Sequence, residues 1–332
     1  MPEENNLPAQ SAAPQSPAAF DPGDFEHIPV LLHECLEGLA IRPDGVYLDG
    51  TAGGAGHSRQ IALRLDGAAG GRLIALDQDP DAVATATARL AGLPAQVVQV
   101  NFRQAKQTLA ALEVPPLAGA LLDLGVSSHQ LDDAARGFSY RADAPLDMRM
   151  SQQGETAADL VNTLSREELA RILRDYGEEP YAWQIAGRIV SAREQQPVQT
   201  TLQLAALVAA TVPPAVRRKD KNPARRTFQA LRIAVNHELD ALDEGLDGIF
   251  DCLAPGGRFA VITFHSLEDR LVKNKFRRWA TACTCPPELP VCVCGGKARA
   301  ALVTRKPIEA ADAERGENRR SRSAKLRVIE KL

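Results

Sequence analysis

Three polar segments of the sequence carry residue types that bind small ligands, and each follows an apolar run. The first, Leu48-Asp-Gly-Thr-Ala-Gly-Gly-Ala-Gly-His-Ser58, is rich in glycine, which lets a backbone approach a ligand closely. Asp77 and Asp123 end two further apolar runs. Ligands of open α/β sheets bind at the carboxyl ends of the strands. We therefore expect Asp49, Asp77 and Asp123 to converge on one crevice.

The glycine-rich segment differs from two common phosphate-binding loops. A Walker A loop requires Gly-Lys-Ser/Thr, whereas Gly56 is followed by His57 and Ser58. The dinucleotide pattern G-x-G-x-x-G also fails, because Arg59 stands three residues after Gly56. The segment therefore suits a nucleoside without a pyrophosphate.

The two aspartates differ in the role that their positions predict. Asp77 lies roughly 20 residues beyond Gly56, where nucleoside-binding sheets place an acid on the ribose hydroxyls. The alternative is that Asp77 only caps the next helix, a role open equally to Asp79. Asp123 opens into a Gly/Ser loop, and such loops often carry function; its alternative is a loop cap.

The elements that position these residues alternate between strand-like and helical patterns in the first part of the chain. This alternation indicates a parallel sheet covered by helices. The expected strands span residues 46–49, 73–77, 96–100 and 120–124. The expected helices span residues 58–65, 81–90 and 103–112.

The alternation stops after Leu124 and resumes far downstream. Residues 137–226 carry helical patterns and many charges, which predicts an inserted helical domain for substrate recognition. The core then comprises residues 25–136 and 227–332, with a disordered tail at residues 1–24. Together these features predict a doubly wound α/β sheet, interrupted by the insertion. In its second part we expect the elements 228–253 (helix), 254–257 (tight turn), 258–264 (buried strand), 268–279 (helix) and 325–329 (edge strand).

Composition favours a globular cytoplasmic protein. The chain has 332 residues, 45% of them hydrophobic, and a formal net charge of −3, which argues against wholesale coating of nucleic acid. We expect no signal peptide in residues 1–24, and no apolar run is long enough for a membrane span. Without an export signal, disulfides are not expected.

Seven blocks resemble the bacterial 16S ribosomal RNA cytosine-N4 methyltransferase family, whose enzymes have a class I, Rossmann-like sheet. The blocks occur in the order of the family and, together, cover residues 27–332. They are Leu48-Asp-Gly-Thr with Gly56-His-Ser58, Leu122-Asp-Leu-Gly-Val-Ser-Ser128, Gln130-Leu-Asp-Asp133, Arg136-Gly-Phe-Ser139, Pro145-Leu-Asp-Met-Arg-Met150, Arg226-Thr-Phe-Gln-Ala230 and Phe264-His-Ser-Leu-Glu-Asp-Arg270.

The resemblance implies methyl transfer from S-adenosylmethionine to the N4 amine of a cytidine in the decoding region of 16S ribosomal RNA, within the small subunit. The implied cofactor-binding residues are Ala55, Gly56, His57, Asp77, Phe102, Asp123 and Gln130. From the residues alone, Phe102 also fits an ordinary core position, His57 a helix start and Gln130 a loop.

The catalytic group is less well defined by the sequence. Most amino-methylating enzymes carry an Asp/Asn-Pro-Pro-aromatic block after the fourth strand, where this chain has Asp123-Leu-Gly-Val126. Candidate acceptors near the amine are Asp123, the hydroxyls of Ser127 and Ser128, and His265. A structural histidine is the equal alternative for His265.

Basic residues gather in three segments of an otherwise slightly acidic chain. These segments suit an RNA backbone, with Phe276 and Trp279 available to stack on bases. Their basic residues are Arg217, Arg218, Lys219, Lys221, Arg225 and Arg226, then Arg270, Lys273, Lys275, Arg277 and Arg278, then Arg315, Arg319, Arg320 and Arg322.

A cluster of four cysteines lies in a proline-rich stretch. Cys283, Cys285, Cys292 and Cys294 offer four thiolates, but C-x-C pairs are tighter than the usual zinc spacing. We therefore expect a reduced loop and no metal, with structural zinc as the alternative.

Two other functions compete with the RNA methyltransferase. A methyltransferase of the same fold acting on a protein or small molecule is disfavoured by the basic segments, and an RNA-binding assembly factor with a relic pocket is disfavoured by the intact loop and carboxylates. The sequence does not indicate the oligomeric state or whether the substrate is free RNA or an assembled subunit.

Overall fold

A mixed eight-stranded sheet forms the centre of the protein in the computed structural model, which describes residues 29–219, 222–282, 285 and 296–332. The strand order is β3-β2-β1-β4-β5-β8-β6, with β7 pairing on β8. Strands β1 to β5 run parallel, and β8 is antiparallel to β5. The strands are β1 (Val46–Asp49), β2 (Arg72–Asp77), β3 (Ala95–Gln99), β4 (Leu117–Asp123), β5 (Leu253–Thr263), β6 (Ala300–Leu302), β7 (Ile308–Glu309) and β8 (Lys325–Lys331).

Helices cover both faces of this sheet, so the predicted doubly wound α/β architecture is confirmed. On one face, the apolar core is built with α1 (Leu32–Leu39), α2 (Gly56–Ala62) and α3 (Pro80–Leu90). On the other, it is built with α4 (Ala105–Ala111), α12 (Glu238–Cys252) and α13 (Ser266–Ala280). The inner strands read as continuous apolar runs because both of their faces are buried.

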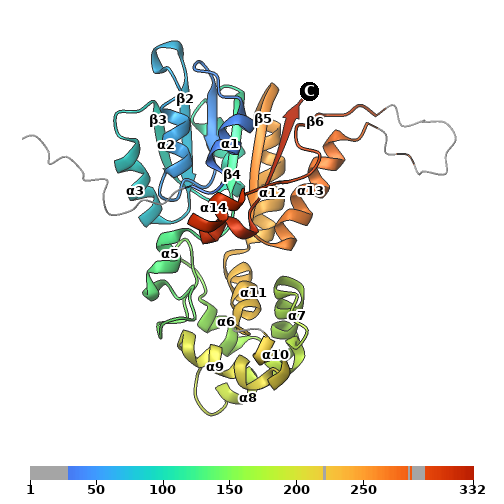
Figure 1. The fold of residues 1–332 in the computed structure, drawn as a ribbon. Helices are drawn as coiled ribbons and strands as arrows, with labels where there is room; N and C mark the ends of the chain where they lie inside the picture. The colour runs from blue at the N-terminus through green and yellow to red at the C-terminus, as the bar shows by residue number, and fades with distance from the viewer. Residues whose placement is uncertain (1–28, 220–221, 283–284, 286–295) are drawn as a thin grey trace, which may run out of the picture.

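A separate group of helices lies beyond the carboxyl edge of the sheet (Figure 1). It has its own apolar core, which includes Leu169, Leu173, Ile185 and Leu204. Helix α11 adds Phe228 to this core. The helices are α6 (Ala157–Thr163), α7 (Arg166–Gly177), α8 (Ala182–Arg193), α9 (Thr201–Thr211), α10 (Pro214–Lys219) and α11 (Arg225–Asn236).

Several of these helices begin where side chains satisfy the first backbone N–H groups. Reciprocal capping boxes join Thr156 with Asp159 in α6 and Ser165 with Glu168 in α7. Such caps fix the helix start because the first turn has no intrahelical acceptors for its N–H groups.

The expected single helix over residues 228–253 is wrong. The chain forms α11 and α12 instead, separated at His237, whose backbone is left-handed with φ of 49°. Just before this break, the side chain of Asn236 accepts a hydrogen bond from the backbone N–H of Met150 and donates one to the carbonyl of Met148. A tertiary contact therefore ends the helix at a point that the helical period does not mark.

The strand expected at the edge is also misplaced. Strand β8 lies between β5 and β6, and Leu326, Val328 and Ile329 are fully buried. Its outer side is covered by β6 and β7, two strands too short to give a clear pattern. The expected turn at residues 254–257 lies within β5, where the pairing with β4 shifts register and Gly256 adopts φ of 77°.

The remaining connections complete the carboxyl edge of the sheet. They include η3 (Phe102–Gln104), α5 (Ser128–Asp132), α14 (Asp312–Glu317) and η5 (Arg319–Ser323). The predicted disordered tail, residues 1–24, lies outside the described residues.

Candidate functional site

One cavity of about 630 Å³ opens at the carboxyl edge of the strands. Pockets for small ligands and cofactors commonly have volumes of about 300–1,000 Å³. Its wall is formed by the glycine loop after β1, the ends of β2 and β4, the start of α12 and the chain after β5. The segment that carries η5 completes it.

The glycine loop is held by two buried aspartates. Asp49 is 1% exposed and accepts hydrogen bonds from Ser58 Oγ at 2.6 Å and from the N–H of Thr51 at 3.0 Å. Asp49 does not line the cavity, so the expectation that three acids converge there is wrong for this residue. It braces the loop, because a buried carboxylate requires hydrogen-bond donors.

Asp77 lines the cavity at the end of β2. Its Oδ2 accepts the N–H of Gly53 at 2.8 Å, and its Oδ1 accepts the N–H of Asp79 at 2.9 Å. Burial raises the pKa of Asp77 to about 6, although these hydrogen bonds oppose the shift. The cap of α3 is Asp79, whose side chain accepts the N–H of Asp81, so the helix-cap alternative does not account for Asp77.

Asp123 lines the same cavity at the end of β4. Its N–H donates to Thr51 Oγ1 at 2.7 Å, and its Oδ2 lies 3.5 Å from Nδ1 of His57. Among the described residues, Oδ1 has no hydrogen-bond partner. Burial raises the pKa of Asp123 to about 6; His57 opposes the shift, and the charges of Asp49 and Glu268 add to it.

The other predicted cofactor residues occupy different parts of the wall. Gly56, His57, Phe102 and Gln130 line the cavity, whereas Ala55 is 1% exposed and lies behind it. Ala55 has φ of 60°, which turns the loop into α2.

Phe102 and Gln130, which line the cavity, also have contacts within the protein. The ring of Phe102 packs so closely on α12 that a Cβ at Gly245 would lie 2.5 Å from it. Gln130 donates to Asp79 Oδ2 at 2.7 Å and accepts the N–H of Ser127 at 3.0 Å. Both polar groups of Gln130 therefore support the neighbouring wall.

Comparison with known proteins decides the family. The model of the MraW methylase family matches residues 24–332. The chain belongs to this family. It is 52% identical over 312 residues to ribosomal RNA small subunit methyltransferase H of Lachnospira eligens, covering 93% of this chain and 98% of the relative. The protein of the same name from Symbiobacterium thermophilum is 54% identical over 311 residues, covering 93% and 97%.

As a member of the MraW methylase family, the chain is an S-adenosylmethionine-dependent methyltransferase with a class I sheet. The cavity fits this cofactor in two respects. It presents a carboxylate, Asp77, at the nucleoside-binding position after β2. Its wall also includes the carboxylate of Asp123, which has one oxygen without a partner among the described residues, and a carboxylate suits a cationic methyl donor.

His265 follows β5 and caps α13. Its Nδ1 accepts the N–H of Glu268 at 3.4 Å, and its Nε2 lies 3.0 Å from Glu268 Oε1. His265 does not line the cavity, whereas its neighbours Phe264 and Glu268 do. These contacts agree with a structural histidine, so the catalytic role of His265 stays a prediction.

The charged residues of this MraW family member that line the cavity and were not predicted as site residues include three that lie close together. They are Arg232, Glu238 and Glu268. The expected continuous helix obscured Arg232 and Glu238, which flank its break. Glu268 stands three residues after His265, the spacing of a capping box.

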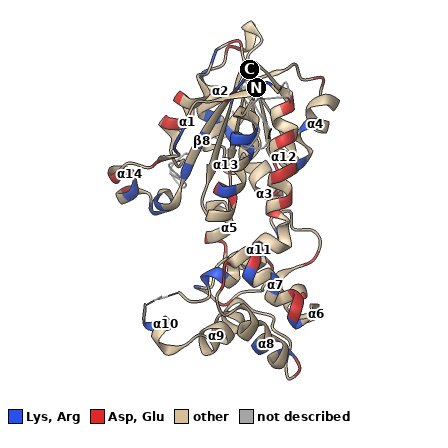
Figure 2. Ribbon diagram, turned by 90° about the vertical axis from the view of Figure 1, so that its right-hand side faces the viewer, with Lys and Arg blue, Asp and Glu red and all other residues tan. Residues whose placement is uncertain are grey.

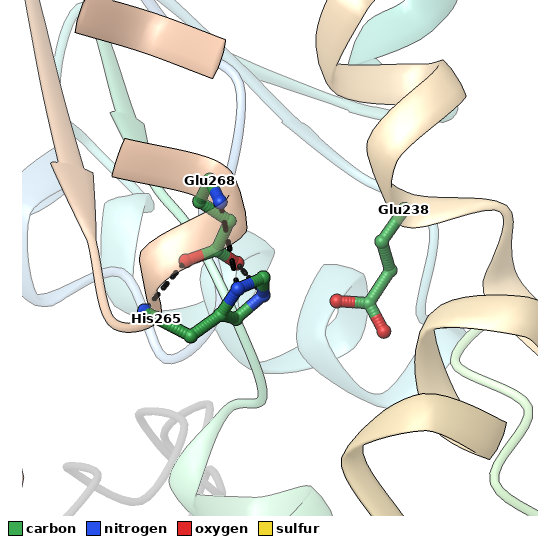
Figure 3. Close-up of side chains that lie close together, drawn as sticks. All are labelled: Glu238, His265 and Glu268. Carbon is green, nitrogen blue, oxygen red and sulfur yellow. Dashed lines mark hydrogen bonds and ion pairs between the residues drawn. The ribbon is translucent and has the colours of Figure 1, made fainter. Parts of the chain in front are cut away.

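Glu238, His265 and Glu268 come close enough for their ligand atoms to lie within 4.8 Å of one another (Figure 3). Burial would raise the pKa of Glu268, but the hydrogen bond with His265 and the charge of Arg232 leave it lowered.

The basic segments divide into paired and unpaired side chains. Arg270 pairs with Glu178, Lys275 with Asp243 and Asp247, Arg315 with Glu309, and Arg320 with Asp132. Figure 2 shows basic positions on α13 and beside α14, and acidic positions along α12. Within these three segments, the exposed basic residues for which the described part of the chain supplies no ion pair are Arg217, Arg218, Arg225, Arg226, Lys273, Arg277, Arg278, Arg319 and Arg322.

Two further predictions concern the cysteines and the membrane. Cys283, Cys292 and Cys294 lie outside the described residues, and Cys285 is a free, half-buried thiol, so the zinc alternative stays open. In the part of the chain that the structure describes, no helix has the length and apolarity to cross a bilayer.

Proposed function

We propose that the protein transfers a methyl group from S-adenosylmethionine to the N4 amine of a cytidine in the decoding region of 16S ribosomal RNA. The observation that carries this proposal is the 52–54% identity, across 93% of the chain, to proteins named ribosomal RNA small subunit methyltransferase H. An RNA substrate of this kind would be met in the cytoplasm, within the small ribosomal subunit.

We assign the cofactor to the β1–β2 side of the cavity. Asp77 would accept the ribose hydroxyls with lone pairs that its two backbone hydrogen bonds leave available. Phe102 would pack on the adenine, since it is an aromatic residue of the cavity wall. Gly56, His57 and Gln130 would shape the wall, and Ala55 would act through the backbone turn that it forms.

Asp123 is the proposed acceptor at the reacting amine. The cofactor supplies a methyl group that is already activated by a sulfonium, so the chain has mainly to position the amine. Correct positioning of reacting groups removes on the order of 7–11 kcal/mol of a barrier. The carboxylate of Asp123, which lines the cavity and has no hydrogen-bond donor on Oδ1 among the described residues, would stabilise positive charge on the amine and take up its proton. His265 would assist by holding Glu268 at the same end.

Substrate recognition is proposed for the helical insertion, residues 137–226, and for exposed basic side chains at its carboxyl end and in the chain that follows it. Residues such as Arg225, Lys273 and Arg319 are exposed and suit contacts with phosphates. The target base has to leave its stack to enter a cavity of this kind.

Mass spectrometry of ribosomal RNA from cells lacking the protein tests the function. We expect the small-subunit RNA alone to lose one methyl group, on a decoding-region cytidine. The wild-type gene should restore it and Asp123→Ala should not. Unchanged methylation of the small subunit would contradict the proposal.

A further inference from the structure

Glu238 faces the residues after β5 across the cavity. It stands at the first position of α12, and its side chain points towards His265 and Glu268 (Figure 3). The carboxylates of Glu238 and Glu268 lie within 4.8 Å of each other. Two acids at this separation repel each other unless a hydrogen-bond donor or a cation lies near both.

Arg232 holds the Glu238 carboxylate in a fixed orientation. Its Nε and Nη2 donate to Oε1 and Oε2, each at 2.8 Å, which is the bidentate geometry of strong Arg–carboxylate pairs. The two side chains are only 14% and 11% exposed, and both line the cavity. The pair is therefore rigid and largely removed from solvent.

This pair still offers hydrogen-bonding capacity to the cavity. A carboxylate has about four lone-pair sites, of which the arginine uses two. The guanidinium has five N–H groups, and among the described residues its Nη1 has no acceptor. One rigid pair thus offers an acceptor next to a donor.

Cytosine carries the complementary pattern on one edge. Its exocyclic amine donates, and the adjacent ring nitrogen N3 accepts; uracil instead has an acceptor at position 4 and a donor at N3. A carboxylate accepting from the cytosine amine is an established mode of base recognition. The Arg232–Glu238 pair matches cytosine and opposes uracil.

We propose that Arg232 and Glu238 select the target base: Glu238 accepts a hydrogen bond from the N4 amine of cytosine, and Arg232 donates to N3. The inference rests on the proposed function and adds the residues that read the base. An acceptor in the plane of the ring also leaves the face of the amine open to the methyl group.

A divalent cation between the three residues fits the geometry less well. The guanidinium of Arg232 already neutralises Glu238 and also acts electrostatically on Glu268. A second cation would be repelled by it, whereas a neutral amine would not.

Competition between small subunits tests the proposal. The substrate is the small subunit from cells lacking the enzyme. Two otherwise identical subunits serve as competitors: in one the target cytidine is already methylated, and in the other it is replaced by uridine. Because each good bidentate base contact discriminates by about 1–3 kcal/mol, the wild type should bind subunits bearing the unmethylated cytidine roughly 5- to 150-fold more tightly than the uridine competitor.

The variant Glu238→Gln should reduce this preference several-fold, because an amide can donate to uracil O4 while Arg232 still opposes the N3–H of uracil. It should bind S-adenosylmethionine within about twofold of the wild type, by calorimetry, while kcat/KM for subunits falls by at least the lost discrimination. The control Glu244→Gln lies on the same helix and removes an exposed pair with Arg103, so its preference should match the wild type.

Three results would overturn the proposal. They are a wild-type preference near one, a retained preference in Glu238→Gln with normal cofactor binding, and binding of Mn²⁺ or Zn²⁺ to RNA-free protein that Glu238→Gln abolishes. If Glu238→Gln does not fold, the wild-type preference alone still decides. Failure of the wild type to methylate any subunit would instead refute the proposed function.

Discussion

His57 Nδ1 lies 3.5 Å from Asp123 Oδ2, while His57 Nε2 lies 3.0 Å from the carbonyl oxygen of Val30. The carbonyl only accepts, so Nε2 carries a hydrogen. In a neutral ring, Nδ1 would then present a lone pair to a carboxylate. The ring of His57 thus lies beside one oxygen of Asp123, while the other oxygen, Oδ1, has no hydrogen-bond partner among the described residues.

The first prediction is that the methyl-transfer rate rises with pH through about 6. Burial raises the pKa of Asp123 to about 6, and only the ionised carboxylate accepts from the amine. At saturating cofactor and RNA, kcat measured from pH 5 to 8 should increase and then level off above pH 7. Asp123→Asn should lower kcat at least 100-fold and remove this dependence. A wild-type kcat that is flat over this range would exclude Asp123 as the acceptor.

The second prediction concerns stability and follows from the same shift. The native pKa of Asp123 lies above its unfolded value, so the native state binds more protons between about pH 4 and 6, and stability falls as pH rises through that window. Asp123→Asn should therefore stabilise the protein at pH 7.5 by on the order of 1 kcal/mol, since the carboxylate is partly open to the cavity. Urea denaturation at pH 4 and 7.5 measures it. An equal effect at both pH values would contradict the assignment.

Asp77→Ala should weaken cofactor binding rather than chemistry. Hydrogen bonds to charged groups contribute about 1.5–3 kcal/mol, so the Kd for S-adenosylmethionine should rise roughly 10- to 150-fold, with a smaller change in kcat at saturation. Calorimetry gives the Kd. The matched control is Asp66→Ala, which removes an exposed carboxylate that also accepts a backbone N–H, from Ala68. An effect as large in the control would show that Asp77 acts only through folding.

Local patterns predicted the part of the site that the sheet itself creates. Asp77 and Asp123 end apolar strands, and parallel strands bring their carboxyl ends to one edge, so the crevice followed from the sequence. Asp49 also ends a strand, but it has a different role because Ser58 and Thr51 donate hydrogen bonds to its carboxylate oxygens. Nothing in the strand pattern distinguishes a braced acid from an open one.

The second half of the cavity depends on contacts between distant segments. Arg232 and Glu238 line it only because the chain breaks at His237, next to an asparagine that bonds Met148 and Met150. These two methionines lie more than 80 residues before Asn236 in the sequence, a separation that helical periodicity does not cover. Likewise, β8 looks like an edge strand until β6 and β7 pair with it.

Binding of the small subunit should weaken steeply with salt, because phosphate contacts release counterions. Arg319 and Arg322 are exposed on η5, the segment that forms one side of the cavity. Replacing both with alanine should reduce the slope of log K against log[salt] by about 1–2. The control pair Arg59→Ala/Arg64→Ala removes basic residues on and after α2. The same slope in wild type and in Arg319→Ala/Arg322→Ala would remove η5 from the RNA surface.

Arg136 joins the insertion to the cofactor side of the cavity. Its Nη1 lies 2.9 Å from Asp79 Oδ2, and its Nη2 donates to the carbonyls of Arg149 and Met150, each at 3.0 Å. Asp79 is only 2% exposed. Arg136→Met would leave this carboxylate buried without its cation, a change that costs about 3–5 kcal/mol.

Urea denaturation should therefore show Arg136→Met to be far less stable than Arg258→Met. Arg258 also combines an ion pair, with Glu330, and a carbonyl contact, with Gly38, but its pair is about one-third exposed and should contribute about 1 kcal/mol or less. Because Asp79 donates its N–H to Asp77, Arg136→Met should also raise the Kd for S-adenosylmethionine. Equal losses of stability in the two variants would mean that Asp79 is stabilised without Arg136, through Gln130 and the backbone of α3.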